Sequence, residues 1–386
     1  MKNYLSPIAA NLPPSGIRKF FDLVSTMKNV ISLGVGEPDF VTPWTVRESG
    51  IFSLEQGQTM YTSNSGILEL RQALTWNMSK NLGLEYNPND EILVTVGASE
   101  AVDLAMRALV APGDVVLLPD PSYVSYAPCA TLAGAEVQYI PTRAEEGFRL
   151  RIEDLERVYT PNAKLLVLSY PNNPTGAIMT REDYLPIAKF VSEHDLIVLS
   201  DEIYSDLTYD GTHTAFASLP LMRNRTLHIS GFSKSYAMTG WRIGYVAGHP
   251  DFIGAMTRIH QYTMLCAPIT AQVAALEALR SAEQAMRDMV GTYDRRRRMM
   301  VHGFRKMGLR CFEPLGAFYV FPDISATGLS SEEFAEQLLL EEKVAVVPGT
   351  AFGPSGEGHI RCSYAYSTDQ IQEALDRMER FVSKRI

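Results

Sequence analysis

Lys234 is the side chain of this sequence best placed for covalent chemistry. It lies within residues 231–244, which read GFSKSYAMTGWRIG and follow a predicted buried strand at residues 227–230. In α/β folds, the loops at the carboxyl ends of such strands hold the ligands. Arg242 belongs to the same segment, and an amine near another cation has a lowered pKa, which suits it to Schiff-base formation. A lysine taken alone is usually a surface residue, so this hypothesis depends on the whole segment.

Polar residues also follow two neighbouring predicted strands. Asp201 and Tyr204 stand in the sequence SDEIY, and Asn173 stands in YPNNPTG. Each has an ordinary reading, as a helix-capping Asp or an Asn-Pro turn. Because parallel strands bring their carboxyl ends to one edge of a sheet, we expect these side chains to lie near Lys234.

The sequence VGASE, at residues 96–100, passes from a predicted strand into a predicted helix. Backbone N–H groups at the start of a helix have no partner within it, and the helix dipole favours negative charge there. Gly97, Ala98 and Ser99 are therefore candidates for holding an anion such as a phosphate. This feature is weak evidence by itself.

The elements that must position these residues alternate between short apolar runs and helix-like segments. A mainly parallel sheet covered by helices on both faces is predicted from the strands at residues 92–95, 115–118, 137–140, 165–169, 196–200, 227–230 and 243–247. A helix is expected to start at Thr180, with Asp183 as its capping partner. After about residue 284 a charged helix leads to strands in GAFYVFPDI, VAVVPG and HIRCSYA. We therefore expect a large domain at residues 41–284 and a smaller α+β domain from residues 1–40 and 285–386.

These motifs resemble a known family. GFSKSYAMTGWRIG is similar to the pyridoxal-phosphate lysine signature of the class I aminotransferases. SLGVGEPDF, YTSNSGILELR, TVGASEAV, PSY, NPTG, SDEIY, GAFY, VPG and HIRCSYA resemble the family's other motifs, in the same order. The resemblance extends from about residue 30 to residue 366. It is nearest to the bacterial aspartate, aromatic and N-acetyl-diaminopimelate aminotransferases.

The resemblance implies a fold-type-I pyridoxal-phosphate-dependent transferase that works as a homodimer with shared active sites. Lys234 would hold the cofactor as a Schiff base and then move the substrate's α-proton. Asp201 would pair with the pyridine nitrogen, and a nearby carboxylate favours the protonated ring. Tyr204 and Asn173 would bind the ring's 3′-oxygen. The phosphate and ring would be held by Ser233, Arg242, Gly97, Ala98, Ser99 and Tyr123, with Tyr61 reaching the phosphate from the other subunit.

Substrate recognition is implied at a second group of residues. Arg361, in HIRCSYA, matches the Arg that binds the substrate's α-carboxylate, and Gly36 would lie beside that site. Arg18, in SGIRKF, is a candidate for reading a distal carboxylate, although a surface Arg explains it equally well. Some aspartate-preferring relatives carry Lys at the position of Ser99, so its absence weakens an assignment to aspartate.

The leading hypothesis is an aminotransferase that acts on an L-amino acid and a 2-oxo acid. Aromatic amino acids, aspartate and N-acetyl-LL-diaminopimelate remain open as donors. The same lysine, aspartate and arginine would also serve a C–S β-lyase or a decarboxylase. A regulator that binds pyridoxal phosphate to sense a ligand is a rival of a different class.

Composition narrows the remaining classes of protein. The chain has 386 residues, 46% of them hydrophobic, and a formal net charge of −9, which is typical of a globular protein that does not bind nucleic acid in general. The basic run at residues 295–298 faces all sides of a helix, which favours a solvated, acid-paired or dimer-contacting helix. No apolar run is long enough for a membrane helix, and the His and Cys residues show no metal-ligand spacing. We therefore expect a cytoplasmic protein with no metal site.

Overall fold

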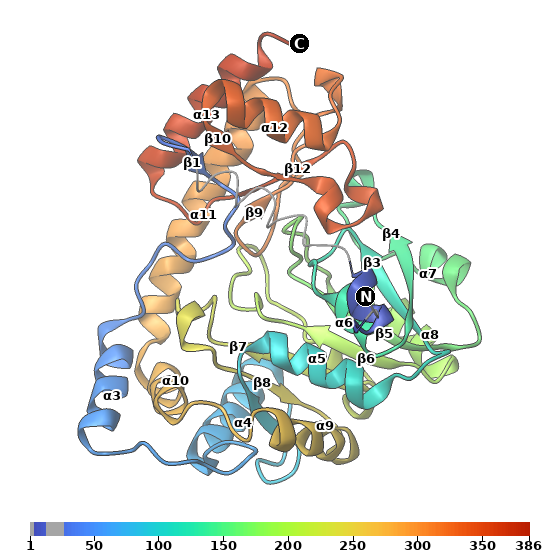
Figure 1. The fold of residues 1–386 in the computed structure, drawn as a ribbon, viewed down its shortest axis with the longest axis vertical. Coiled ribbons are helices and arrows are strands. Elements are labelled where there is room, and N and C mark those ends of the chain that lie inside the picture. The colour runs from blue at the N-terminus through green and yellow to red at the C-terminus, as the bar shows by residue number, and fades with distance from the viewer. Residues whose placement is uncertain (1–3, 13–26) are drawn as a thin grey trace.

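A sheet of seven strands forms the centre of the molecule (Figure 1), which the computed structural model describes at residues 4–12 and 27–386. The strand order is β2-β8-β7-β6-β5-β3-β4. The sheet is parallel except at β8, which pairs antiparallel with both β2 and β7. The strands are β2 (Ile92–Thr95), β3 (Val115–Asp120), β4 (Glu136–Pro141), β5 (Ala163–Ser169), β6 (Ile197–Asp201), β7 (Thr226–Gly231) and β8 (Gly244–Ala247).

Helices cover both faces of this sheet. Successive residues of a strand point to opposite faces, and apolar side chains on each face pack against helices. In β5, Leu165 and Val167 pack with α5 (Ala98–Leu109), α6 (Tyr126–Leu132) and α9 (Pro250–Thr263). Leu166 and Leu168 pack in another cluster, with α7 (Ile152–Val158) and α8 (Arg181–Glu193). Three further helices, α3 (Trp44–Glu55), α4 (Leu68–Leu82) and α10 (Ile269–Ser281), complete this part of the chain.

The expected mainly parallel sheet is confirmed, and so is the start of α8. Thr180 is the N-cap of that helix, and its hydroxyl accepts the Asp183 N–H while the Asp183 carboxylate accepts the Thr180 N–H. This reciprocal capping satisfies two backbone donors that have no partner inside the helix.

The C-terminal residues build a second layer, and a long helix joins it to the part of the molecule that contains the seven-stranded sheet (Figure 1). This helix, α11 (Glu283–Lys306), leads to β9 (Tyr319–Val320), α12 (Ser331–Glu342), β10 (Val344–Ala345), β11 (Val347–Pro348), β12 (Ile360–Ser363) and α13 (Thr368–Val382). β9 and β11 flank β12 in an antiparallel sheet. Near the N-terminus lie α1 (Pro7–Asn11) and β1 (Ile31–Ser32), and β1 pairs parallel with β10.

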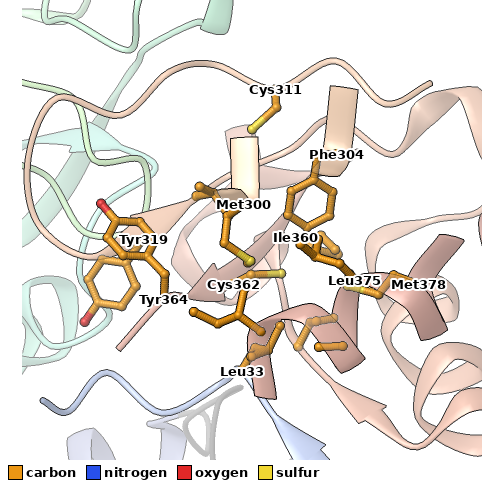
Figure 2. Packing of buried hydrophobic residues seen from close by; sticks show 14 of the residues in the cluster. Leu33, Met300, Phe304, Cys311, Tyr319, Ile360, Cys362, Tyr364, Leu375 and Met378 are labelled. Carbon is orange, nitrogen blue, oxygen red and sulfur yellow. The ribbon is translucent and has the colours of Figure 1, made fainter. Parts of the chain in front are cut away.

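Buried side chains from distant parts of the sequence meet in this second layer. Figure 2 shows Leu33, Met300, Phe304 and Cys362 packed together in one cluster. The early residues therefore join the C-terminal part, although the domain boundaries at residues 40/41 and 284/285 stay a prediction.

The strand expected along GAFYVFPDI is shorter than predicted, since only Tyr319 and Val320 belong to β9. Pro322 has no N–H to donate, which limits further pairing in this segment. Only an isolated bridge, between Asp323 and His359, follows it.

In the basic run at residues 295–298, the last three arginines are paired with carboxylates, whereas the first bonds a threonine hydroxyl. Arg296 makes two bonds of 2.8 Å to the Asp39 carboxylate. Arg297 is almost fully buried, and it bonds Asp294 and the carbonyl of Pro314. These pairs tie α11 to the segments beside it. In the described part of the chain, none of the helices is long and apolar enough to cross a membrane.

Candidate active site

A cavity of about 520 Å³ lies where the carboxyl ends of β5, β6 and β7 meet the second layer. The structure brings most of the predicted site residues together around it. They are Gly36, Ala98, Ser99, Tyr123, Asn173, Asp201, Tyr204, Ser233, Lys234, Arg242 and Arg361.

Lys234 follows β7, and its amine is held inside the cavity. Its Nζ donates a hydrogen bond of 2.6 Å to the carbonyl of Gly36 and lies 5.9 Å from the centre of the Tyr204 ring. Burial lowers the pKa of Lys234 to about 8; the Glu37 carboxylate opposes this, while the cations of Arg361 and Arg242 add to it. The amine therefore loses its proton far more readily than an exposed lysine does, as a nucleophile or base requires.

Asp201 is the last residue of β6 and is buried. Its Oδ2 accepts a hydrogen bond of 2.7 Å from the Tyr126 hydroxyl, and its Oδ1 accepts one of 3.2 Å from the N–H of Ile203. Burial raises the pKa of Asp201, and these two donors oppose the rise. A cationic ring nitrogen placed beside this carboxylate would be strongly attracted to it.

The start of α5 and the Arg242 side chain form a tight corner of the cavity. Gly97 is the N-cap of α5 and has a φ of 79°. A Cβ atom there would lie 2.6 Å from Nη2 of Arg242, and a Cβ atom at Gly244 would lie 2.6 Å from the N atom of Ala98. The positive φ therefore favours glycine at position 97, and the close backbone requires glycine at position 244. The corner joins a helix N-terminus to a guanidinium group, an arrangement that suits a phosphate.

Arg361 projects from β12 between two aromatic rings. Its Cζ lies 4.6 Å from the centre of the Tyr319 ring and 4.7 Å from that of Phe352. It donates hydrogen bonds of 3.0 Å to Oδ1 of Asn173 and of 2.5 Å to the carbonyl of Gly34. Its buried Nε has no hydrogen-bond partner among the described residues. A guanidinium group held in this way still has donor capacity for a carboxylate.

Two predicted residues that the structure describes do not line the cavity. Gly97 lies next to the Arg242 guanidinium group, and Tyr61 is 82% exposed on the surface of the single chain. Arg18 lies outside the described residues, so its role stays a prediction.

Among the residues that line it and that the sequence reasoning did not single out are Tyr126, Tyr319 and Glu37. Glu37 accepts a hydrogen bond from the Thr239 hydroxyl, close to Lys234. Both tyrosines belong to quoted motifs or follow them closely, since Tyr319 ends GAFY and Tyr126 comes soon after PSY. The motifs alone did not show which side chains these two tyrosines contact.

No group of three His, Cys, Asp or Glu residues that could hold a metal ion occurs within residues 4–12 and 27–386.

Comparison with known proteins places the chain in a family. Residues 28–378 match the family described as aminotransferase class I and II. Bacillus subtilis YugH, which is named as an aminotransferase, is 52% identical, with 100% of both chains covered. The aspartate aminotransferase of Pyrococcus abyssi is 45% identical, with 96% of each chain covered. The crystal structure of the aromatic aminotransferase of Pyrococcus horikoshii has a TM-score of 0.92 at 44% identity, and it covers 96% of this chain and 99% of its own.

All the residues that line the cavity lie inside the region matched by the family. These matches favour transamination over the lyase, decarboxylase and regulator hypotheses, because the matched proteins carry aminotransferase names. The chain belongs to the class I and II aminotransferases and is a pyridoxal-phosphate-dependent aminotransferase of fold type I.

Proposed function

We propose that Lys234, Asp201, Arg242 and Arg361 are the central active-site residues of this aminotransferase. The observation that carries the proposal is the buried Lys234 amine, whose pKa is lowered to about 8, in the same cavity as the other three side chains. Each of these residues offers the charge that one part of the reaction needs.

The residues around the cavity fit pyridoxal phosphate. The N-terminus of α5 with Ser233 and Arg242 would hold the phosphate, and Tyr123 would pack against the ring. Asp201 would hold the ring nitrogen, and Asn173 and Tyr204 would bind the ring's 3′-oxygen. The lack of a side chain at Gly97 leaves room for the Arg242 guanidinium group beside the helix N-terminus, where a phosphate carries its charge. When bound, this cofactor supplies an electron sink for the negative charge that the α-carbon acquires.

Lys234 would move the proton. The carbonyl of Gly36 orients the amine from one side at 2.6 Å. The neutral amine is needed to accept a proton from the α-carbon, and burial makes that form accessible near neutral pH. The ammonium form then returns the proton to a neighbouring atom. One residue thus serves as base and acid without a second titratable group.

Arg361 would bind the α-carboxylate of the amino acid. A planar guanidinium group can bind a carboxylate through two parallel hydrogen bonds. Asn173 and the carbonyl of Gly34 fix the direction of the group. The rings of Tyr319 and Phe352 pack against the group, which is almost fully buried, and the exclusion of water strengthens the attraction.

The proposal includes a homodimer with shared sites. Large apolar side chains are exposed on α3, on the segment after it, and near the C-terminal end of α9. They include Trp44, Phe52, Met60, Tyr61 and Tyr262. Exposed apolar surface of this kind is typical of an interface between proteins. Tyr61 would reach the phosphate of the partner's site from this surface. A cytoplasmic location and the division into domains at residues 40/41 and 284/285 belong to the same proposal.

The amino donor is the open part of the function. The relatives include enzymes named for aspartate and for aromatic amino acids. Ser99 stands where some aspartate-preferring relatives carry a Lys, which weakens an assignment to aspartate alone. Aromatic donors and N-acetyl-LL-diaminopimelate therefore join aspartate as the substrates to test.

The test is an absorbance titration of the purified protein loaded with pyridoxal phosphate. The visible band of the bound cofactor should change when a suitable amino acid is added, and a 2-oxo acid should restore it. Aspartate, phenylalanine, glutamate and N-acetyl-LL-diaminopimelate are added one at a time. Lys234→Ala should abolish the band and the turnover. Lys189→Ala, on the exposed face of α8, is the matched control and should behave as wild type. Turnover at the wild-type rate by Lys234→Ala would refute the assignment.

A further inference from the structure

Tyr319 connects the two groups of residues assigned above to the cofactor and to the substrate. It is buried in β9 and belongs to the cluster of buried residues in the second layer. Figure 2 shows Tyr319 at the edge of that cluster, next to Tyr364. The Tyr319 ring lies against the Arg361 guanidinium group at 4.6 Å, and its hydroxyl lies 2.7 Å from the Tyr204 hydroxyl. One side chain thus contacts both the carboxylate-binding and the cofactor-binding residues.

The two hydroxyl groups have one proton more than their mutual hydrogen bond needs. Each tyrosine carries a single O–H, and only one of the two donates in the pair. Among the described residues, neither hydroxyl has another hydrogen-bond partner, so the second proton is available to a ligand in the cavity. Which tyrosine donates decides where this proton points.

The surroundings favour Tyr319 as the donor. The Arg361 cation packs on its ring and opposes the rise that burial causes in the pKa of Tyr319. A phenol with a lower pKa is the better donor. Burial raises the pKa of Tyr204 well above its usual value, and the contact with Tyr319 adds to this rise. The Arg361 cation opposes the rise at Tyr204 as well, but it packs directly on the Tyr319 ring. The other charged and titratable groups that face the pair are Lys234, Tyr123 and Tyr366.

We propose that Tyr319 is a positioning residue: it donates its proton to Tyr204 and thereby directs the Tyr204 proton toward the 3′-oxygen of the bound cofactor. A hydroxyl that accepts one hydrogen bond becomes a stronger donor of the next. Tyr319 thus strengthens the bond that Tyr204 makes, while its ring keeps Arg361 in place. This inference rests on the proposed role of Tyr204 in the active site.

The test is Tyr319→Phe, measured by the pH dependence of the bound cofactor's absorbance. Phenylalanine keeps the ring against Arg361 and removes only the hydroxyl. Tyr204 then becomes a weaker donor, so more negative charge stays on the 3′-oxygen. The nitrogen that joins Lys234 to the cofactor holds its proton more firmly as a result. The midpoint of the absorbance change should rise by roughly half a pH unit to one unit, while KM for the amino acid stays within about twofold because Arg361 keeps its packing.

A second variant shows whether the effect passes through Tyr204. In a Tyr204→Phe background, adding Tyr319→Phe should leave the midpoint unchanged. Tyr364→Phe is the matched control: this buried tyrosine also loses a hydroxyl bond, to the carbonyl of Ala317, but it does not line the cavity. Its midpoint should equal that of the wild type.

The outcomes separate this inference from the proposed function. An unchanged midpoint in Tyr319→Phe, with a normal cofactor band, would overturn the inference alone. A lower midpoint would also overturn it, because it would mean that Tyr204 donates to Tyr319 in the wild type. A wild-type protein with no cofactor band at all would instead overturn the proposed function.

Discussion

Gly36 has no room for a side chain, and Gly36→Ala should damage the active site through one atom. A Cβ atom at this position would lie 2.3 Å from the Tyr319 hydroxyl oxygen, whereas ordinary contacts begin at 3.4 Å. The difference, about 1 Å, must be absorbed by the backbone of residues 34–36 or by Tyr319. Overpacking of this kind costs about 1–3 kcal/mol of folding free energy.

The larger effect should appear in catalysis. The carbonyl of Gly36 holds the Lys234 amine, and the carbonyl of Gly34 holds Arg361. A shift of this backbone moves both side chains. Because misplacement of reacting groups by 1 Å can cost about a hundredfold in rate, we expect kcat/KM to fall by roughly 10-fold to 100-fold. Steady-state kinetics with a responding amino acid, and urea unfolding of the same preparation, measure the two effects.

The double variant Gly36→Ala/Tyr319→Phe tests the stated cause. Without the hydroxyl, the nearest ring atom is Cζ at 3.2 Å, which a small movement relieves. Gly36→Ala should therefore cost much less in the Tyr319→Phe background, with a coupling of about 1–2 kcal/mol. Gly254→Ala is the control, because the nearest atom there is 3.8 Å away. If Gly36→Ala costs the same with and without the Tyr319 hydroxyl, the steric explanation is wrong.

Two further predictions concern ionisable groups. Because burial lowers the pKa of Lys234 to about 8, the rate at which the apoprotein takes up pyridoxal phosphate should rise with pH below that value and level off above it; a rate still rising near pH 10, where an exposed lysine titrates, would contradict the lowered pKa. Asp39→Asn leaves buried Arg296 without its carboxylate, so urea unfolding should show a loss of about 1–3 kcal/mol. Asp103→Asn breaks an exposed pair with Arg107 and should cost less than about 0.5 kcal/mol; equal losses in the two variants would show that burial of Arg296 does not matter.

Much of the fold could be predicted because its pattern is local. Strands such as Ala163–Ser169 are apolar on both faces and end at turn-forming residues, and Thr180 and Asp183 are close enough in sequence to cap a helix together. The strand through GAFYVFPDI was predicted too long, since its apolar side chains pack in a core without continuous pairing. Burial alone does not distinguish a strand from a buried loop.

The site residues likewise divide into those that a local sequence pattern marks and those that only a contact across the fold reveals. Asp201 ends a buried strand and Lys234 follows one closely, so the rule for strand ends finds both. Tyr126 lies on the helix α6, whereas its partner Asp201 lies on the strand β6 of the sheet. No local pattern marks a tyrosine whose function depends on a contact made across the fold.

The Tyr204–Tyr319 contact explains why chemistry and packing cannot be separated in this cavity. Tyr319 is a core residue by burial, and a search for exposed polar groups would pass over it. Its hydroxyl nevertheless faces the cavity, fills the space beside Gly36 and bonds Tyr204. Gly36 must therefore be a glycine because Tyr319 carries a hydroxyl, and that hydroxyl is needed because Tyr204 requires a donor. The motifs GEPDF, SDEIY and GAFY, read separately in the sequence, thus form one constraint in the folded protein.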